Sequence, residues 1–139
     1  MGTSVDVLRT ERSERKLMQK KIHLTIFILL LIMGFVLTLA PIEVQEGVDK
    51  VYHFIGFFAI SISAITTFYV FFGEKHLNIF MAFLLTFGAL LAGISEDLQK
   101  FVPQRGCDVT DWFTNLAGIS LACVLTLFLH FKKQKEEEI

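Results

Sequence analysis

Residues 51–72, VYHFIGFFAISISAITTFYVFF, decide the fold, because these 22 positions contain no Lys, Arg, Asp or Glu. A helix of that length spans about 33 Å, which is enough to cross the ~30 Å hydrocarbon core of a bilayer. Backbone amides inside a bilayer have no water to bind, so such a stretch is expected to be helical. Three further stretches of the same kind lie at residues 22–40, 77–94 and 113–131.

The composition agrees with a membrane protein. Apolar residues make up 53% of the 139 positions, and 15 residues are Phe. That share exceeds what a soluble core of this size needs. We therefore predict an all-α, polytopic membrane protein with a four-transmembrane-helix bundle at residues 22–131, a basic arm at 1–21 and a short tail at 132–139.

The first apolar stretch invites comparison with a signal peptide. It is 19 residues long and follows a charged arm of 21 residues, whereas a cleavable core usually has 7 to 15 apolar residues. We expect a membrane helix that ends near Pro41, because proline disfavours helical geometry in the residue before it.

Basic residues are distributed unevenly between the two ends of the predicted bundle. Ten of the 13 Lys and Arg fall in the arm, the turn at residues 73–76 and the tail, while Lys50, Lys100 and Arg105 lie at the opposite end. The positive-inside rule then places both termini in the cytoplasm. In a bacterium this indicates a multi-pass protein of the inner membrane, with loops 41–50 and 97–107 facing outward.

Polar side chains gather at that outward end, where they are costly beside lipid and indicate a functional site. Asp49 and His53 are four residues apart, and Glu96 and Gln99 are three apart, so each pair shares a helix face.

The last span begins with a polar stripe. Its members are Asp108, Asp111, Asn115 and Gly118. At ~100° per residue they lie within an arc of roughly 80°. Asp108 is predicted to cap the helix and Asp111 to lie in its first turn, where carboxylates satisfy free N–H groups.

The combined pattern resembles a known family. Asp49-Lys50-x-x-His53-Phe54 is followed by Glu96, Gln99, Pro103, Arg105, Asp108, Asp111, Asn115 and Gly118, which is similar to the VanZ-like family of small membrane proteins over roughly residues 41–118. The family takes its name from a protein associated with teicoplanin resistance. The resemblance implies a role at the bacterial cell envelope, near the lipid carriers and peptide stems that glycopeptide antibiotics engage.

The charges of the predicted site do not balance. Lys50 and Arg105 face four carboxylates, which leaves a formal charge of −2 when His53 is neutral. Such carboxylates need partners. They could share protons, pair with the cations, or bind a divalent cation such as Mg²⁺ or Ca²⁺. No metal is assigned, and Asp108, Asp111 and Glu96 are the candidate ligands.

The first interpretation is a pocket that binds, and in one version processes, an anionic lipid-linked or peptide-carboxylate envelope ligand. Arg105 would be the bidentate clamp, assisted by Lys50 or protonated His53. For catalysis, His53 would act as a general acid or base oriented by Asp49. Whether the protein is an enzyme stays open. The ligand-binding set is Lys50, Glu96, Gln99, Arg105, Asp108, Asp111 and Asn115.

Two alternatives remain. Intramembrane carboxylates with a His are typical of proton relays, so the protein could be a proton-coupled transporter or flippase component. The four spans show no internal repeat, and a homo-oligomer would have to supply the second half. The other alternative is a buried polar network that only fixes helix packing.

The remaining features are less specific. Cys107 and Cys123 are some 24 Å apart along a helix, so we expect no disulfide, and there is no zinc-type spacing. The arm and tail mix acids with bases, which does not indicate nucleic-acid binding. The expected partners are membrane lipids.

Overall fold

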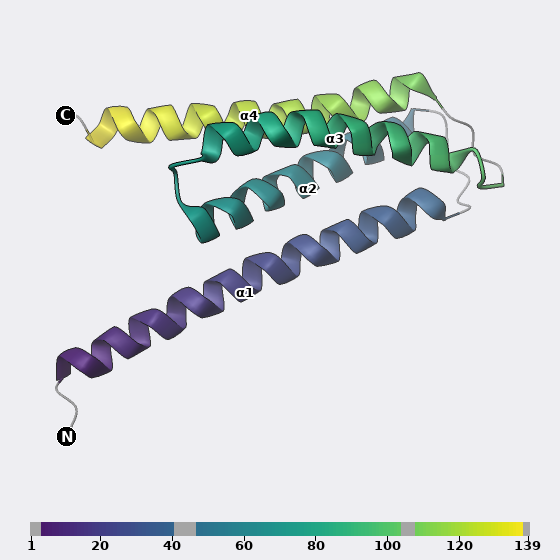
Figure 1. Ribbon diagram of the computed structural model, residues 1–139. Helices are drawn as coiled ribbons and strands as arrows, with labels where there is room; N and C mark the ends of the chain where they lie inside the picture. The colour runs from purple at the N-terminus through teal and green to yellow at the C-terminus, as the bar shows by residue number, and fades with distance from the viewer. Residues whose placement is uncertain (1–3, 41–46, 104–107, 138–139) are drawn as a thin grey trace.

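The computed structural model describes residues 4–40, 47–103 and 108–137, and nearly all of them are helical (Figure 1). The helices are α1 (Ser4–Leu39), α2 (Val48–Phe72), α3 (Leu77–Gln99) and α4 (Val109–Glu137). Each is long and apolar enough to cross a membrane. The prediction of an all-α, multi-pass membrane protein with a four-helix bundle is confirmed.

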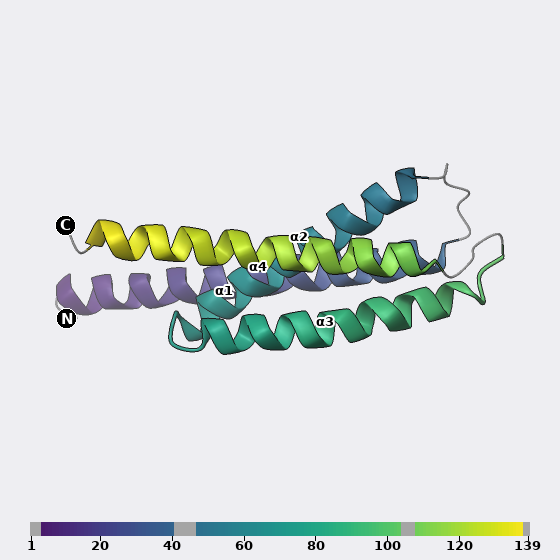
Figure 2. The ribbon, with the colours of Figure 1, turned by 90° about the horizontal axis from the view of Figure 1, so that it is seen from above.

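Successive helices run in opposite directions along a common axis (Figures 1 and 2). The C-terminal ends of α1 and α3 therefore lie at the same end of the bundle as the N-terminal ends of α2 and α4. Both chain termini lie at the opposite end. This alternation brings the described polar residues that the sequence analysis singled out to one end.

The closest helix contact is between α2 and α4, which cross at Gly118. A Cβ atom at this position would lie 2.6 Å from the carbonyl oxygen of Phe54 and 3.0 Å from the amide nitrogen of Phe58. Only a residue without a side chain allows the two backbones to approach this closely. Toward the end that holds the termini, the core continues with Ile65, Leu77, Met81, Ala122 and Cys123.

Helix α3 joins this pair through side chains of α4. Ile119 of α4 packs against Gly88 of α3. A Cβ atom added to Gly88 would lie 2.9 Å from the Cδ1 atom of Ile119. One side chain also links the two helices by a hydrogen bond, since Trp112 Nε1 donates to the carbonyl oxygen of Ala89 at 2.9 Å. These contacts hold the middle of α3 beside the first half of α4.

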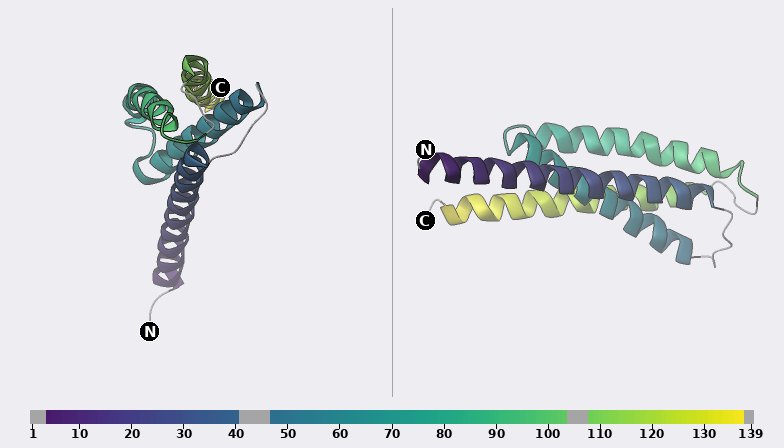
Figure 3. Two further views of the ribbon diagram at one scale, coloured as in Figure 1. Left: turned by 90° about the vertical axis from the view of Figure 1, so that its right-hand side faces the viewer. Right: turned by 90° about the horizontal axis from the view of Figure 1, so that it is seen from below.

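Helix α1 packs less closely. Its most apolar window has no buried residue, and its N-terminal half stands away from the other helices (Figure 3). Gly34 lies against Ile60, and Thr67 Oγ1 donates to the carbonyl oxygen of His23 at 3.2 Å. A helix with an apolar, exposed surface suits contact with lipid, so α1 supports the bundle from one side.

The end of α2 is fixed by a glycine and an acid. Gly73 has a φ of 72°, which favours glycine, and its N–H donates to the carbonyl oxygen of Tyr69. Glu74 then accepts hydrogen bonds from the Tyr69 hydroxyl at 2.9 Å and from Lys133 of α4 at 3.3 Å. These bonds hold the pKa of Glu74 below its usual value.

The helices extend further than the predicted spans. Helix α1 begins at Ser4, in the charged arm, while α3 ends at Gln99 and α4 begins at Val109. Hydropathy identifies the part of a helix that lies in lipid, but backbone hydrogen bonding continues through charged residues. Pro41 lies outside the described residues, and α1 ends two positions before it.

We expect Gly118→Ala to lower the free energy of unfolding by about 1–3 kcal/mol, because the new methyl group must push α2 and α4 apart. The measurement is thermal or denaturant unfolding in detergent micelles. Gly56→Ala is the matched control, since an added Cβ there meets no atom within 4 Å. Equal stability of the two variants would contradict the close crossing.

Candidate functional site

The site begins at the first turn of α4, where Asp108 caps the helix. Asp108 Oδ1 accepts the backbone N–H of Thr110 at 2.8 Å, and the Asp108 carbonyl oxygen accepts that of Asp111 at 3.0 Å. The predicted N-cap is confirmed. Because the cap fixes the helix start, the side chain of Asp111 is directed into the bundle and is buried.

Lys50 of α2 is bonded to this turn. Its Nζ atom lies 2.7 Å from Asp108 Oδ2, 2.7 Å from Thr110 Oγ1 and 2.8 Å from Asp111 Oδ1. An ammonium group has three protons, so these bonds use all of its donors. Lys50 therefore neutralises the acids of α4 and has no donor left for a ligand.

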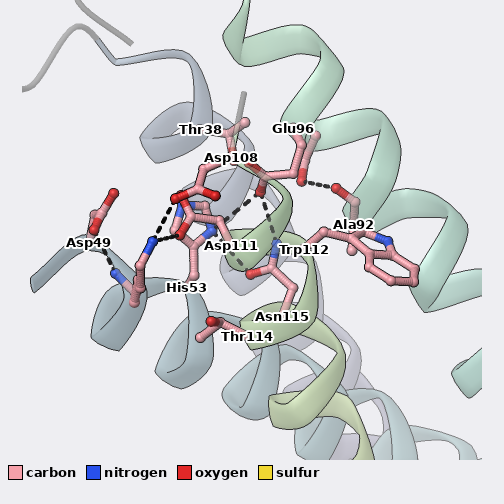
Figure 4. A network of polar contacts seen from close by, with 12 residues as sticks. Thr38, Asp49, His53, Ala92, Glu96, Asp108, Asp111, Trp112, Thr114 and Asn115 are labelled. Atoms are coloured by element: carbon pink, nitrogen blue, oxygen red, sulfur yellow. Dashed lines mark hydrogen bonds and ion pairs between the residues drawn. The ribbon is translucent and has the colours of Figure 1, made fainter. Parts of the chain in front are cut away.

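A second set of contacts links all three helices. Asn115 of α4 is fully buried; its Nδ2 atom donates to Glu96 Oε1 of α3 at 3.0 Å. Its Oδ1 atom lies 3.0 Å from His53 Nδ1 of α2. Figure 4 shows Asn115 between these two side chains.

This arrangement fixes the tautomer of His53. A carboxylate can only accept hydrogen bonds, so Asn115 presents its amide nitrogen to Glu96 and its carbonyl oxygen to His53. His53 Nδ1 must then carry the proton. In the neutral imidazole, the lone pair is on Nε2, which lies 3.8 Å from Asp111 Oδ2.

The site is graded from exposed to buried. The side chains of Asp108 and Lys50 are 47% and 33% exposed, that of His53 is 12% exposed, and that of Asp111 is 4% exposed. The polar groups thus lead from the end of the bundle into its interior. A charged group at such depth needs a partner. Asp111 has Lys50 as its charged partner and His53 as a neighbour, and both come from α2.

Asp49 occupies a different position from the one predicted. Its Oδ1 atom accepts the backbone N–H of Lys50 at 2.9 Å, and the carboxylate nearest to His53 Nε2 is that of Asp111. A shared helix face was therefore not sufficient to bring the Asp49 carboxylate to the His53 ring. A short carboxylate in the first turn of a helix satisfies the free N–H groups beside it.

Gln99 is buried one turn beyond Glu96 on α3. Its Nε2 atom has no hydrogen-bond acceptor among the residues that the structure describes. Arg105, predicted as the bidentate clamp, lies outside the described residues. The structure thus brings together six of the predicted residues: Lys50, His53, Glu96, Asp108, Asp111 and Asn115.

Sequence reasoning missed two contributors. Thr110 bonds Lys50, and Trp112 holds α4 against α3. Thr110 could have been found from its position two residues after the predicted cap, where a hydroxyl lies beside the first turn. The role of Trp112 depends on a contact between helices and has no local signal.

A divalent cation was one option for the carboxylates. Within residues 4–40, 47–103 and 108–137, no three His, Cys, Asp or Glu side chains form a group that could hold a metal ion. The ammonium of Lys50 lies where such an ion would have to bridge Asp108 and Asp111.

Replacing Asn115 by Leu should destabilise the protein. The substitution leaves Glu96 Oε1 and His53 Nδ1 without their shared partner, and each such loss costs about 1–3 kcal/mol. Thermal unfolding in detergent measures the effect. Thr114→Ala is the control, because its exposed hydroxyl bonds only the carbonyl oxygen of Thr110 in its own helix. The contact is refuted if the two variants unfold alike.

A pH dependence follows from Asp108. Lys50, and then the Thr110 hydroxyl and N–H, hold the pKa of the Asp108 carboxyl well below its ordinary value of 3.8. The unfolded chain therefore takes up the proton first as pH falls. At pH values above 3.8, wild type should be more stable than Asp108→Asn by a constant margin. This difference in stability should shrink at lower pH.

Unfolding scans between neutral pH and about pH 2.5 would measure this margin. Asp97→Asn is the control, because it removes a carboxylate that is exposed on α3 and paired locally with Lys100. A margin for Asp108 that stayed constant to the lowest pH would contradict the bond to Lys50.

Comparison with known proteins gives one relationship. No family model matches the chain, and no solved structure matches it. The "Uncharacterized protein C11E3.10" of the fission yeast Schizosaccharomyces pombe is 35% identical over 121 residues, which cover 87% of this chain and 70% of that protein. The chain therefore belongs to the same family as this fission yeast protein.

Proposed function

We propose that this protein binds an anionic group, a phosphate or carboxylate, of a membrane lipid or lipid-linked envelope molecule at the polar end of its bundle. The observation that carries the proposal is the convergence of buried polar side chains from three helices. Asp111, Asn115 and Glu96 are at most 3% exposed, in a bundle whose helices are long and apolar enough to cross a membrane. Such groups are costly in a membrane protein and are usually functional.

The anionic character of the ligand is supported by an unmatched donor. Gln99 is 3% exposed, and its Nε2 atom lacks an acceptor within the described part of the chain. A buried amide without a partner costs about 1–3 kcal/mol, and a phosphate or carboxylate oxygen would remove this cost. The VanZ-like resemblance adds Arg105, whose guanidinium matches both groups in a bidentate manner.

The orientation and the membrane belong to the same proposal. Ten of the 13 Lys and Arg lie toward the end that holds both termini, so the positive-inside rule puts the site at the outer face. In a bacterial cell the membrane would be the inner one. Because the family includes a fission yeast protein, we favour a ligand that is not specific to bacteria, namely one built on a lipid phosphate. A link to glycopeptide resistance rests on the VanZ-like resemblance alone.

A proton-coupled transporter is the second candidate. It is favoured by the series of polar groups that runs from Lys50 through Asp111, His53 and Asn115 to Glu96, in which every step is a hydrogen bond except the 3.8 Å step between Asp111 and His53. As a homo-oligomer, the protein could provide two such routes. Proton-driven uptake into vesicles that was unchanged in Glu96→Gln would remove this candidate.

Lipid extraction followed by mass spectrometry tests binding directly. Purified wild type should retain a phosphate-bearing lipid, and Gln99→Leu and Arg105→Ala should each retain about tenfold less, which corresponds to 1.4 kcal/mol. Lys135→Ala removes an exposed cation near the opposite end and should retain as much as wild type. If all four proteins retain the same lipids, the binding proposal is refuted, and a lower unfolding temperature of Gln99→Leu or Arg105→Ala would then show that the polar end only fixes helix packing.

A further inference from the structure

The site contains two acceptor atoms that face each other. In the tautomer that Asn115 imposes, His53 Nε2 carries a lone pair, and it lies 3.8 Å from Asp111 Oδ2. This separation is too long for a hydrogen bond between them. Neither atom accepts a hydrogen bond from the residues that the structure describes.

The other atoms of these side chains are already used. Lys50 occupies Asp111 Oδ1, and Asn115 occupies His53 Nδ1. The Asp111 side chain is 4% exposed, so bulk water cannot freely solvate its remaining oxygen. The two acceptors lie on side chains that are 12% and 4% exposed, and at this distance one atom that donates a hydrogen bond to each would stabilise both.

The charge of the cluster selects the kind of donor. Lys50 is the one cation among the described side chains of the cluster when His53 is neutral, and its ammonium pairs with the carboxylates of Asp108 and Asp111. One cation against these two carboxylates leaves a formal charge of −1, which favours a cationic donor over a hydroxyl. A primary ammonium has three N–H groups on one atom, so it can bond both acceptors at ordinary distances.

We infer that His53 Nε2 and Asp111 Oδ2 together bind a primary ammonium group, so that the ligand is a phospholipid whose headgroup carries an amine beside its phosphate. The inference rests on the proposed function and specifies its ligand. Gln99 supplies the unmatched donor for the phosphate, and the His53–Asp111 pair supplies the unmatched acceptors for the amine.

A series of methylated headgroups tests the inference without changing the protein. Phosphatidylethanolamine and its monomethyl form have at least two N–H donors, the dimethyl form has one, and phosphatidylcholine has none. All four share the phosphate and the positive charge. Affinity should fall about tenfold between the monomethyl and dimethyl forms, equivalent to 1.4 kcal/mol.

The single Trp of the chain reports binding. Trp112 follows Asp111 directly and is held to α3 by its hydrogen bond to Ala89. Lipids with identical brominated acyl chains quench its fluorescence on contact, so their apparent affinities can be compared in one protein. Asp111→Asn should abolish the difference between the lipids, and Asp97→Asn, which changes an exposed carboxylate, should preserve it.

The outcomes separate the two proposals. If the four lipids bind equally, or if phosphatidylglycerol binds better than phosphatidylethanolamine, the amine site is wrong while headgroup binding stands. If none of these lipids binds in preference to the others and none is retained on purification, both proposals fail.

Discussion

The salt bridge between Lys50 and the first turn of α4 is the interaction on which the site depends. A carboxylate as buried as that of Asp111 cannot remain charged at the end of a membrane bundle without a cation. Lys50 provides that cation and also bonds Asp108 and Thr110, so it fixes the start of α2 against the start of α4. The crossing at Gly118 then allows the two helices to approach closely enough for His53 and Asn115 to meet.

This constraint explains why the remaining groups point to a ligand. Lys50, Asn115 and the Asp108 cap have partners for their hydrogen-bonding groups, so the polar end is already held together by the protein itself. The exceptions are the amide of Gln99 and the facing acceptors of His53 and Asp111. A network needed only for packing would not require these unmatched groups, whereas a headgroup with a phosphate and an amine would match both kinds.

Much of the architecture could be predicted from the sequence. The four spans follow from hydropathy, and the stripe of Asp108, Asp111 and Asn115 follows from helical spacing, because both patterns depend on a single helix. The partners of each side chain could not be predicted this way. Asp49 was predicted as the neighbour of His53 because the two share a helix face, whereas the crossing of α2 and α4 places Asp111 beside His53. The use of all three Lys50 donors likewise depends on contacts between helices.

The central claim is that polar side chains of separate helices interact inside the bundle, and a double-mutant cycle between Glu96 of α3 and Asn115 of α4 tests it most directly. Unfolding free energies of wild type, Glu96→Met, Asn115→Leu and the double variant give the coupling. The account predicts that the double variant loses less stability than the sum of the single ones, with a coupling of about 0.5–3 kcal/mol. Additive losses, within about 0.3 kcal/mol, would show that the two side chains do not interact and would contradict the account.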